Sequence, residues 1–233
     1  MRRLVETAVC IVAALLLVGT WLVEPYSVVS GSMHPTLHGP HRAFVCPHCL
    51  QAVTTAADFT PIPDRPAYCP RCQRPGPIED RLPLIPGDGL LVDRTAFWYR
   101  TPRRGEIVAF RLPAEAKKVA VKRIVGLPNE TIEIRHRQIF ADGLRIATPI
   151  DEDFTPPAWY DGPARWTLGP DEYFALGDNP RLSDDSRTWP QGPGVSAQLI
   201  IGKPFIVHAP RRAAEPFGLR FHVPDITAIR YIR

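Results

Sequence analysis

Residues 119–125 read VAVKRIV, a run in which two cations stand among five aliphatic side chains. Successive side chains of a β-strand point to opposite faces, so Lys122 and Arg123 must face opposite ways. Aliphatic residues lie on both faces of this run. The pattern therefore predicts a strand in the interior of the protein, but periodicity alone does not decide which cation is buried.

The chemistry of the two side chains separates them. An arginine stays protonated in any protein, whereas a desolvated lysine can lose its proton and act as a base. A free lysine titrates near pH 10.4, so a base that works at neutral pH needs its pKa lowered by roughly two to three units, or about 3–4 kcal/mol. Burial among aliphatic side chains can supply that penalty on the charged form. The hypothesis is that Lys122 is a neutral general base.

Short apolar or alternating runs, separated by Pro and Gly, extend from this strand in both directions. Asp142-Gly143 is a two-residue hairpin signal between QIFA and LRIA. No long amphipathic helix is expected after residue 23, so the prediction is a mainly antiparallel β domain. The expected strands are Leu90–Asp93, Glu106–Arg111, Val119–Val125, Thr131–Ile134, Tyr173–Leu176 and Leu199–His208.

Composition narrows the class of protein. The 233 residues include 27 prolines, which favour loops and short strands because proline interrupts helices and sheet centres. The net charge of +4 is small, and the cations are scattered among 24 acidic residues, so no nucleic-acid partner is expected. A weakly basic exterior also suits a protein that lies against anionic lipid.

The N-terminal segment Thr7–Val23 is a run of seventeen residues without a charge. As a helix it is about 25 Å long, which is short but sufficient to cross a bilayer core. Arg2 and Arg3 precede it, and no Lys or Arg follows until Arg42, so the expected topology is a single-pass anchor with a cytoplasmic N-terminus. A cleaved secretory signal is the alternative, but no Ala-x-Ala-like site follows the run.

Residues outside a cysteine-rich segment resemble the type I signal peptidases, which are membrane serine proteases with a Ser–Lys dyad. Ser30-Gly31-Ser32 alone is more typical of an ordinary turn. The resemblance depends instead on blocks in the correct order, namely SGSMHPTL (30–37), PGDGLLVDR (86–94), RRGEIVAFRLP with VKRIVGLPNE (103–113 and 121–130), and GDNPRLSDDSRTW (177–189).

The resemblance implies a role for six residues. Ser32 matches the nucleophile, Lys122 matches the general base, and Ser30 matches the serine whose hydroxyl completes the oxyanion hole together with the N–H of Ser32. Ser183 matches the residue that hydrogen-bonds the lysine amine. Asp185 and Arg187 match a pair that braces the site. None of the seven histidines stands in a recognisable triad-like setting.

Some positions depart from the family pattern. None of them is a proposed nucleophile, base or lysine partner, and the departure at Pro180 puts mainly the shape of its loop in doubt. They are Arg94 at the end of the second block, Glu106 for an aspartate, Pro180-Arg181-Leu182 after Gly-Asp-Asn, and Pro190 after Trp189.

By the same resemblance, the expected function is removal of N-terminal signal peptides from exported preproteins, by cleavage after small residues in an Ala-x-Ala-like site. Catalysis would need no cofactor. The expected partners are preproteins and the lipid bilayer. The expected location is the inner (cell) membrane, with the catalytic domain on its outer face, where Ser32 lies within about 28 Å of chain from Glu24.

Cys46, Cys49, Cys69 and Cys72 form the pattern C-x2-C-x19-C-x2-C. Two such knuckles are typical of a tetrahedral structural zinc site with four cysteine ligands. Two disulfides are the alternative, since the segment should face an oxidising compartment. Type I signal peptidases do not generally carry this insert, so its partner is unknown. His48 is expected to face solvent.

These patterns predict four parts of the chain. A short cytoplasmic N-terminus (1–6) precedes the anchor (7–23). The catalytic domain comprises 24–38 and 84–233, interrupted by a zinc-ribbon-like module at 39–83. Two other functions compete with this interpretation. A non-catalytic membrane adaptor has no need to retain Ser32, Lys122 and Ser183 together, and a self-cleaving repressor has no room for a DNA-binding head in the six residues before the apolar run.

Overall fold

The computed structural model describes residues 2–57, 64, 66–135, 138–147, 164–208, 211–214, 221–224 and 229–232. Residues 58–63 and 65 of the expected module lie outside the described residues, as do 136–137, 148–163, 209–210, 215–220, 225–228 and 233 of the expected catalytic domain. The described chain is mainly antiparallel β, which confirms the expected fold class.

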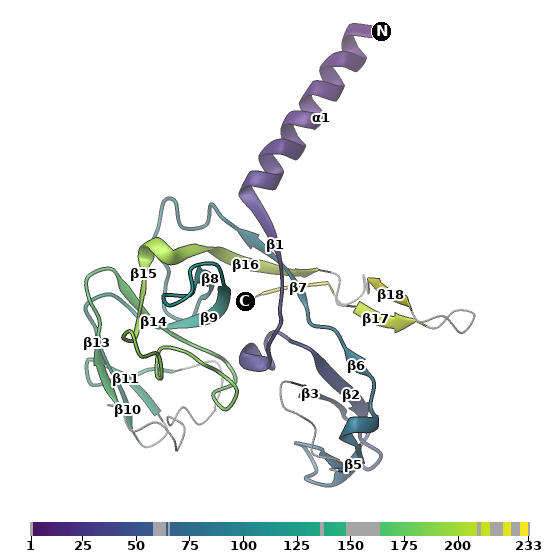
Figure 1. Cartoon of the computed structure of the whole chain (residues 1–233), viewed down its shortest axis with the longest axis vertical. Helices are drawn as coiled ribbons and strands as arrows, with labels where there is room; N and C mark the ends of the chain where they lie inside the picture. Colours follow the sequence, from purple (N-terminus) through teal and green to yellow (C-terminus); the bar gives the residue numbers. More distant parts are fainter. Residues whose placement is uncertain are drawn as a thin grey trace.

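One large antiparallel sheet forms the body of the protein (Figure 1). Each predicted strand on this sheet is present to within one residue at either end, and the VAVKRIV run lies near its middle, paired on both sides. The sheet order is β1 (Val23–Ser27), β7 (Gly89–Asp93), β16 (Ile200–His208), β8 (Ile107–Arg111), β9 (Val119–Gly126), β14 (Glu172–Leu176) and β15 (Gly194–Ser196), and β19 (Arg230–Tyr231) also pairs with β16.

A second, four-stranded sheet packs against the first. The predicted hairpin is present, and its turn residues Asp142 and Gly143 both have positive φ (47° and 79°), as a type I′ turn requires. Trp166 and Phe174 join the two sheets with their ring centroids 5.1 Å apart. The order of this sheet is β12 (Leu144–Arg145), β11 (Gln138–Ala141), β10 (Thr131–Arg135) and β13 (Arg165–Thr167).

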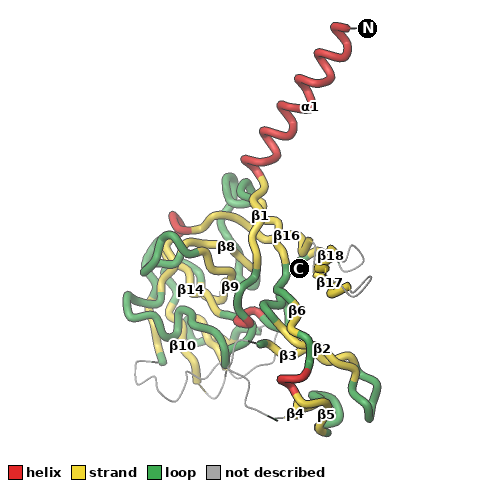
Figure 2. The backbone as a smooth tube through the Cα atoms, turned by 45° about the vertical axis from the view of Figure 1, so that its right-hand side comes forward, coloured by secondary structure: helices red, strands yellow, loops and turns green. Residues whose placement is uncertain are grey.

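The cysteine-rich segment forms two small sheets that extend from the body (Figure 2). The first continues one strand past the expected boundary at residue 83, because His41 pairs with Ile85. The orders are β3 (Ala52–Ala56), β2 (His41–Val45), β6 (Leu84–Ile85) and, separately, β4 (Pro66–Tyr68) with β5 (Pro75–Ile78). Another two-stranded sheet pairs β17 (Arg211–Ala214) with β18 (Phe221–Pro224).

Among the described residues, α1 (Arg2–Leu22) is the only α-helix, and the chain passes from it directly into β1. The helix projects away from the sheets in Figures 1 and 2. Within the described part of the chain, no helix has the length and apolar character needed to cross a membrane. Short 3₁₀ helices cover Gly31–Met33, Glu79–Arg81 and Ala197–Leu199.

Candidate active site

Lys122 is buried in the middle of the large sheet. It lies on β9 opposite Val108 of β8, and only 5% of the residue is exposed. Its Nζ donates a hydrogen bond to Ser183 Oγ at 3.1 Å. Burial lowers the pKa of Lys122 from 10.5 to about 8, although the carboxylates of Asp185 and Asp184 act in the opposite direction. The amine can therefore be neutral within the range of pH in which a general base is useful.

Ser32 lies in the 3₁₀ helix Gly31–Met33, just after β1. Its carbonyl oxygen accepts a hydrogen bond from the N–H of Asn179 at 2.9 Å, which ties the serine turn to the loop after β14. Ser30 Oγ donates to Ser32 Oγ at 3.2 Å, so the hydroxyl predicted to complete the oxyanion hole contacts the predicted nucleophile. Ser32 itself is 7% exposed.

Gly177 brings Ser32 and Ser183 together. A Cβ atom at this position would lie 2.2 Å from Ser183 Oγ and 2.5 Å from the Ser32 carbonyl oxygen, so any larger residue would collide with both. Lys122 is hydrogen-bonded to one of these serines, and the other packs against the same glycine. Ser183 thus contacts the Lys122 amine directly, and the Ser32 carbonyl packs against the same glycine as Ser183.

Asp185 and Arg187 form a fully buried pair behind the site. The Arg187 Nε donates to Asp185 Oδ1 at 2.8 Å and Nη2 donates to Oδ2 at 3.0 Å, with both side chains 0% exposed. Asp185 also accepts the N–H of Gly177 at 3.1 Å, and Arg187 donates to the carbonyl of Pro180 at 3.0 Å. The unusual Pro180 loop is thus fastened to the bracing pair.

A second buried ion pair, which the sequence reasoning did not assign, lies beside Lys122. Arg123 makes a bidentate contact with Asp178, with Nε–Oδ1 at 2.8 Å and Nη2–Oδ2 at 2.6 Å. Thr36, from the serine block, donates to the same Asp178 carboxylate at 2.6 Å. Both cations of VAVKRIV are therefore buried. The sequence signal for this pair was Asp178, the acidic residue of the Gly-Asp-Asn motif, to which no role had been given.

The four cysteines converge in the separate module. Their Sγ atoms all lie within 4.8 Å of one another, and the cysteines are free. Separations of 3.6 Å join Cys46 to Cys72 and Cys49 to Cys69 across the two knuckles. Four sulphurs at the usual Zn–S distance of 2.3 Å from one ion would stand about 3.8 Å apart, so the geometry fits a tetrahedral metal.

Both knuckles have the same backbone form. The N–H of Leu50 bonds the carbonyl of Cys46 at 3.0 Å, and the N–H of Gln73 bonds that of Cys69 at 2.9 Å. Leu50 and Gln73 have positive φ, 58° and 57°. Burial raises the pKa of the Cys46 thiol, but the N–H groups of neighbouring residues outweigh it and lower the value to about 6. His48 is exposed, as expected.

The fold and site together define a mainly β protein with a buried serine–lysine cluster. The family described as "Signal peptidase, peptidase S26" matches residues 79–209, more than half of the chain, and the protein belongs to that family. The matched range includes Lys122 and the Ser183 loop, whereas Ser32 lies before it.

Individual relatives agree with the family. The chain is 33% identical to signal peptidase I of Leptolyngbya laminosa over 138 residues, which cover 54% of this chain and 63% of the relative. It is 32% identical to probable signal peptidase I-2 of Synechocystis over 51% of this chain and 54% of the relative. It therefore spans less than two thirds of either relative. A signal peptidase I structure from Enterococcus faecalis V583 matches 45% of this chain and 97% of its own, at 27% identity and a TM-score of 0.37.

Proposed function

We propose that this chain is a membrane-anchored serine endopeptidase that removes N-terminal signal peptides from exported preproteins. The observation that carries the proposal is the buried Lys122 amine, hydrogen-bonded to Ser183 at 3.1 Å, while Ser32 packs against the same glycine as Ser183. Membership of the signal peptidase family supports the choice of substrate. Cleavage after small residues at an Ala-x-Ala-like site is part of the same proposal.

In the proposed mechanism, the neutral Lys122 Nζ accepts the proton of Ser32 Oγ as that oxygen attacks the scissile carbonyl carbon. The Ser32 N–H and the Ser30 hydroxyl donate to the developing oxyanion, and the 3.2 Å contact between the two hydroxyls supports this role for Ser30. Ser183 holds the amine in position. The Lys122 ammonium then passes this proton to the leaving amine. In the second half of the reaction, the neutral Lys122 accepts a proton from the water molecule that attacks the acyl-enzyme carbonyl, and its ammonium protonates Ser32 Oγ as that oxygen leaves.

We also propose that α1 anchors the enzyme in the bilayer. The seventeen uncharged residues Thr7–Val23 support this role. The apolar side chains of α1 also lie open to the surroundings, with Val9 61%, Ile11 54% and Val12 55% exposed. A soluble domain rarely leaves so much apolar surface uncovered. The basic start of the chain favours a cytoplasmic N-terminus and an outer-face catalytic domain.

A structural zinc ion held by Cys46, Cys49, Cys69 and Cys72 completes the proposal. The inter-knuckle Sγ separations of 3.6 Å and the repeated turn support a four-thiolate site. With four protein ligands, the ion would leave no position for water or substrate, so its role would be to hold the module together and not to catalyse the cleavage.

Cleavage of a preprotein with an Ala-x-Ala site tests the enzymatic proposal. We expect Ser32→Ala and Lys122→Met each to lower kcat by at least about 10³-fold, because each removes a member of a unit that acts together. Ser27→Ala and Lys118→Met are matched controls at exposed positions and should keep the parent rate. Full processing by Ser32→Ala would overturn the proposal and favour the adaptor function.

A further inference from the structure

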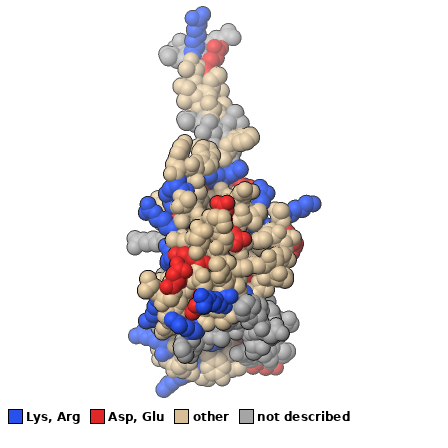
Figure 3. Space-filling view, turned by 90° about the vertical axis from the view of Figure 1, so that its left-hand side faces the viewer, with Lys and Arg blue, Asp and Glu red and all other residues tan. Residues whose placement is uncertain are grey.

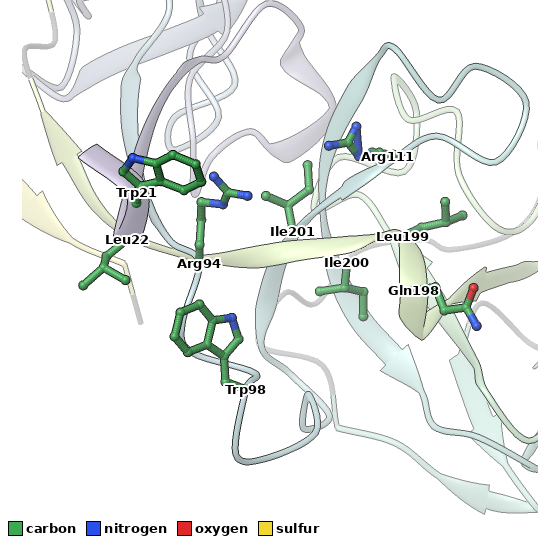
Figure 4. Close-up of a pocket in the computed structure, with 9 residues that line it drawn as sticks. All are labelled: Trp21, Leu22, Arg94, Trp98, Arg111, Gln198, Leu199, Ile200 and Ile201. Carbon is green, nitrogen blue, oxygen red and sulfur yellow. The ribbon is translucent and has the colours of Figure 1, made fainter. Parts of the chain in front are cut away.

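A pocket of about 360 Å³ lies where the end of α1 meets the large sheet (Figure 4). Its walls come from four separate elements: Trp21 from α1, Arg94 and Trp98 from the turn after β7, Arg111 from β8, and Ile200 from β16. The N–H of Arg94 donates to the carbonyl of Leu22 at 2.9 Å, so the sheet is fastened to the helix at this point. The volume is in the range of small-molecule sites.

The pocket is cationic. Arg94 has only a long contact with Glu24, 3.8 Å between Nε and Oε2, with both side chains about two-fifths exposed. Among the residues that the structure describes, no carboxylate lies within ion-pair distance of Arg111, whose side chain is exposed. Both guanidinium groups act on the Tyr26 hydroxyl, where they oppose the burial and the Glu24 contact that raise its pKa to about 12. Among the described groups that act on Tyr26, the two guanidinium groups of Arg94 and Arg111 are therefore set against a single carboxylate, that of Glu24.

Aromatic side chains surround the same edge. Trp21 is 75% exposed and Trp98 is 61% exposed, and the adjoining Tyr99 is 92% exposed. Trp98 and Tyr99 lie in the loop that follows β7. In Figure 4 the Arg94 side chain lies between the two indole rings, and Figure 3 shows Lys and Arg side chains gathered around the base of the helix. Exposed tryptophans beside arginines are typical of the headgroup level of a membrane.

We propose that this pocket binds the phosphate headgroup of an anionic phospholipid in the leaflet that contacts the catalytic domain. The inference rests on the proposed anchor, since α1 must hold the pocket at the membrane surface. The fork-shaped guanidinium groups of Arg94 and Arg111 match phosphate oxygens. Ile200 and Leu22 give the glycerol and upper acyl carbons an apolar wall, which a free phosphate ion would not use.

The site has a consequence for the enzyme. It would fix the tilt of the domain on the bilayer, because one lipid would contact the helix end, the turn after β7 and the start of β16 together. That orientation, together with the short chain between α1 and Ser32, would set the height of Ser32 above the lipid.

Native mass spectrometry of the full chain in neutral detergent tests the proposal. The parent is titrated with dioctanoyl phosphatidylglycerol, dioctanoyl phosphatidylcholine and inorganic phosphate. We expect phosphatidylglycerol to bind most tightly. Arg94→Gln with Arg111→Gln should weaken that binding about thirtyfold, since each basic residue contributes about 1 kcal/mol to the attraction of anionic lipid. Arg94→Lys with Arg111→Lys should recover part of the loss.

Arg74→Gln with Arg145→Gln is the matched control, because it removes the same charge from two exposed positions elsewhere, one just before β5 and one in β12. Equal phosphatidylglycerol binding in parent and pocket variant would overturn the proposal, and so would an equal loss in the control. Inorganic phosphate bound as tightly as the lipid would make this a free-anion site and would also overturn it.

Two further measurements separate this inference from the proposed function. Preprotein cleavage in the same lipid-free detergent reports on Ser32 and Lys122 alone, and the pocket variant should match the parent there. A raised KM for preprotein in the pocket variant, with lipid binding unchanged, would make the pocket a substrate site and overturn the lipid assignment. Loss of cleavage by the parent would instead count against the enzymatic proposal, while lipid binding would still be measurable.

Discussion

The candidate active site and the cysteine module each gather ionisable side chains, but they are built in opposite ways. Lys122 lies on a strand paired on both sides within the large sheet, beside an apolar cluster that includes Val108, Phe110 and Ile124. In the module, Cys46 and Cys69 are themselves core residues, 0% exposed. The other buried members of that small core are Phe44, Val53 and Ala67.

In one region the fold determines the state of the ionisable group, and in the other the ionisable groups determine the fold. In the large sheet, the fold imposes burial on the lysine, and burial lowers its pKa to about 8. In the module, strands of two to five residues form two small sheets, which are marginal on their own. There, the proposed metal would create the fold. Removing a charged partner should therefore destabilise the first region, and removing a ligand should disorder only the second.

The largest effect on the free energy of unfolding is expected for Asp178→Asn. This change leaves the Arg123 guanidinium, which is 7% exposed, without its counter-charge inside the sheet. Breaking a buried pair in this way costs about 3–5 kcal/mol. Chemical unfolding of the full chain in neutral detergent measures it. The control Asp184→Asn makes the same change at an exposed position and should cost little. Equal small losses in both variants would mean that the fold does not depend on this pair.

The pH dependence of stability tests whether the sheet imposes the low pKa of Lys122. Between about pH 8 and 10.5 the unfolded chain binds one more proton at this residue than the folded chain does. The free energy of unfolding of the parent therefore rises with pH across this window and is flat below it, as far as Lys122 contributes. Lys122→Met lacks this contribution. Relative to the parent, the variant should lose up to about 3 kcal/mol from pH 8 to 10.5.

Thermal or chemical unfolding at several pH values gives this difference, and Lys118→Met is its control because Lys118 is exposed and paired with Glu115. The cleavage rate of the parent should rise over the same lower part of the window, around pH 8, because only the neutral amine accepts a proton. A pH-independent difference between parent and variant would show that the lysine keeps an ordinary pKa.

The sequence predicted most of the sheet because its signals are local. Alternation, the Asp142-Gly143 turn and breaks at Pro and Gly located the strands that carry Lys122 and its neighbours. The same locality explains what was missed. Arg123 and Asp178 are 55 residues apart and Thr36 is 142 residues from Asp178, so nothing within one strand reveals that they share a carboxylate.

The choice between Lys122 and Arg123 shows the limit most clearly. Alternation gave two equivalent apolar faces, and the expectation was that chemistry would select one cation for burial. The structure buries both, with 5% and 6% exposure, because each face supplies a polar partner: Ser183 for the lysine and Asp178 for the arginine. The short strands of the module were also missed, since runs of three to five residues among nine prolines carry no periodic signal.

The smallest effect on the catalytic domain is expected for Cys46→Ser. Loss of one thiolate should release the metal and remove hydrogen-exchange protection from β2 to β5, because little apolar area remains to hold these strands. The amides of β9 should keep their protection, and unfolding of the large sheet should change by less than about 1 kcal/mol, since distant sites act independently. Cys10→Ser makes the same exchange in α1 and should leave both regions unchanged. If β9 lost protection together with β2, the two regions would form one cooperative unit. The route of coupling would then be the close packing of Ser30 against Gly39, two residues before β2.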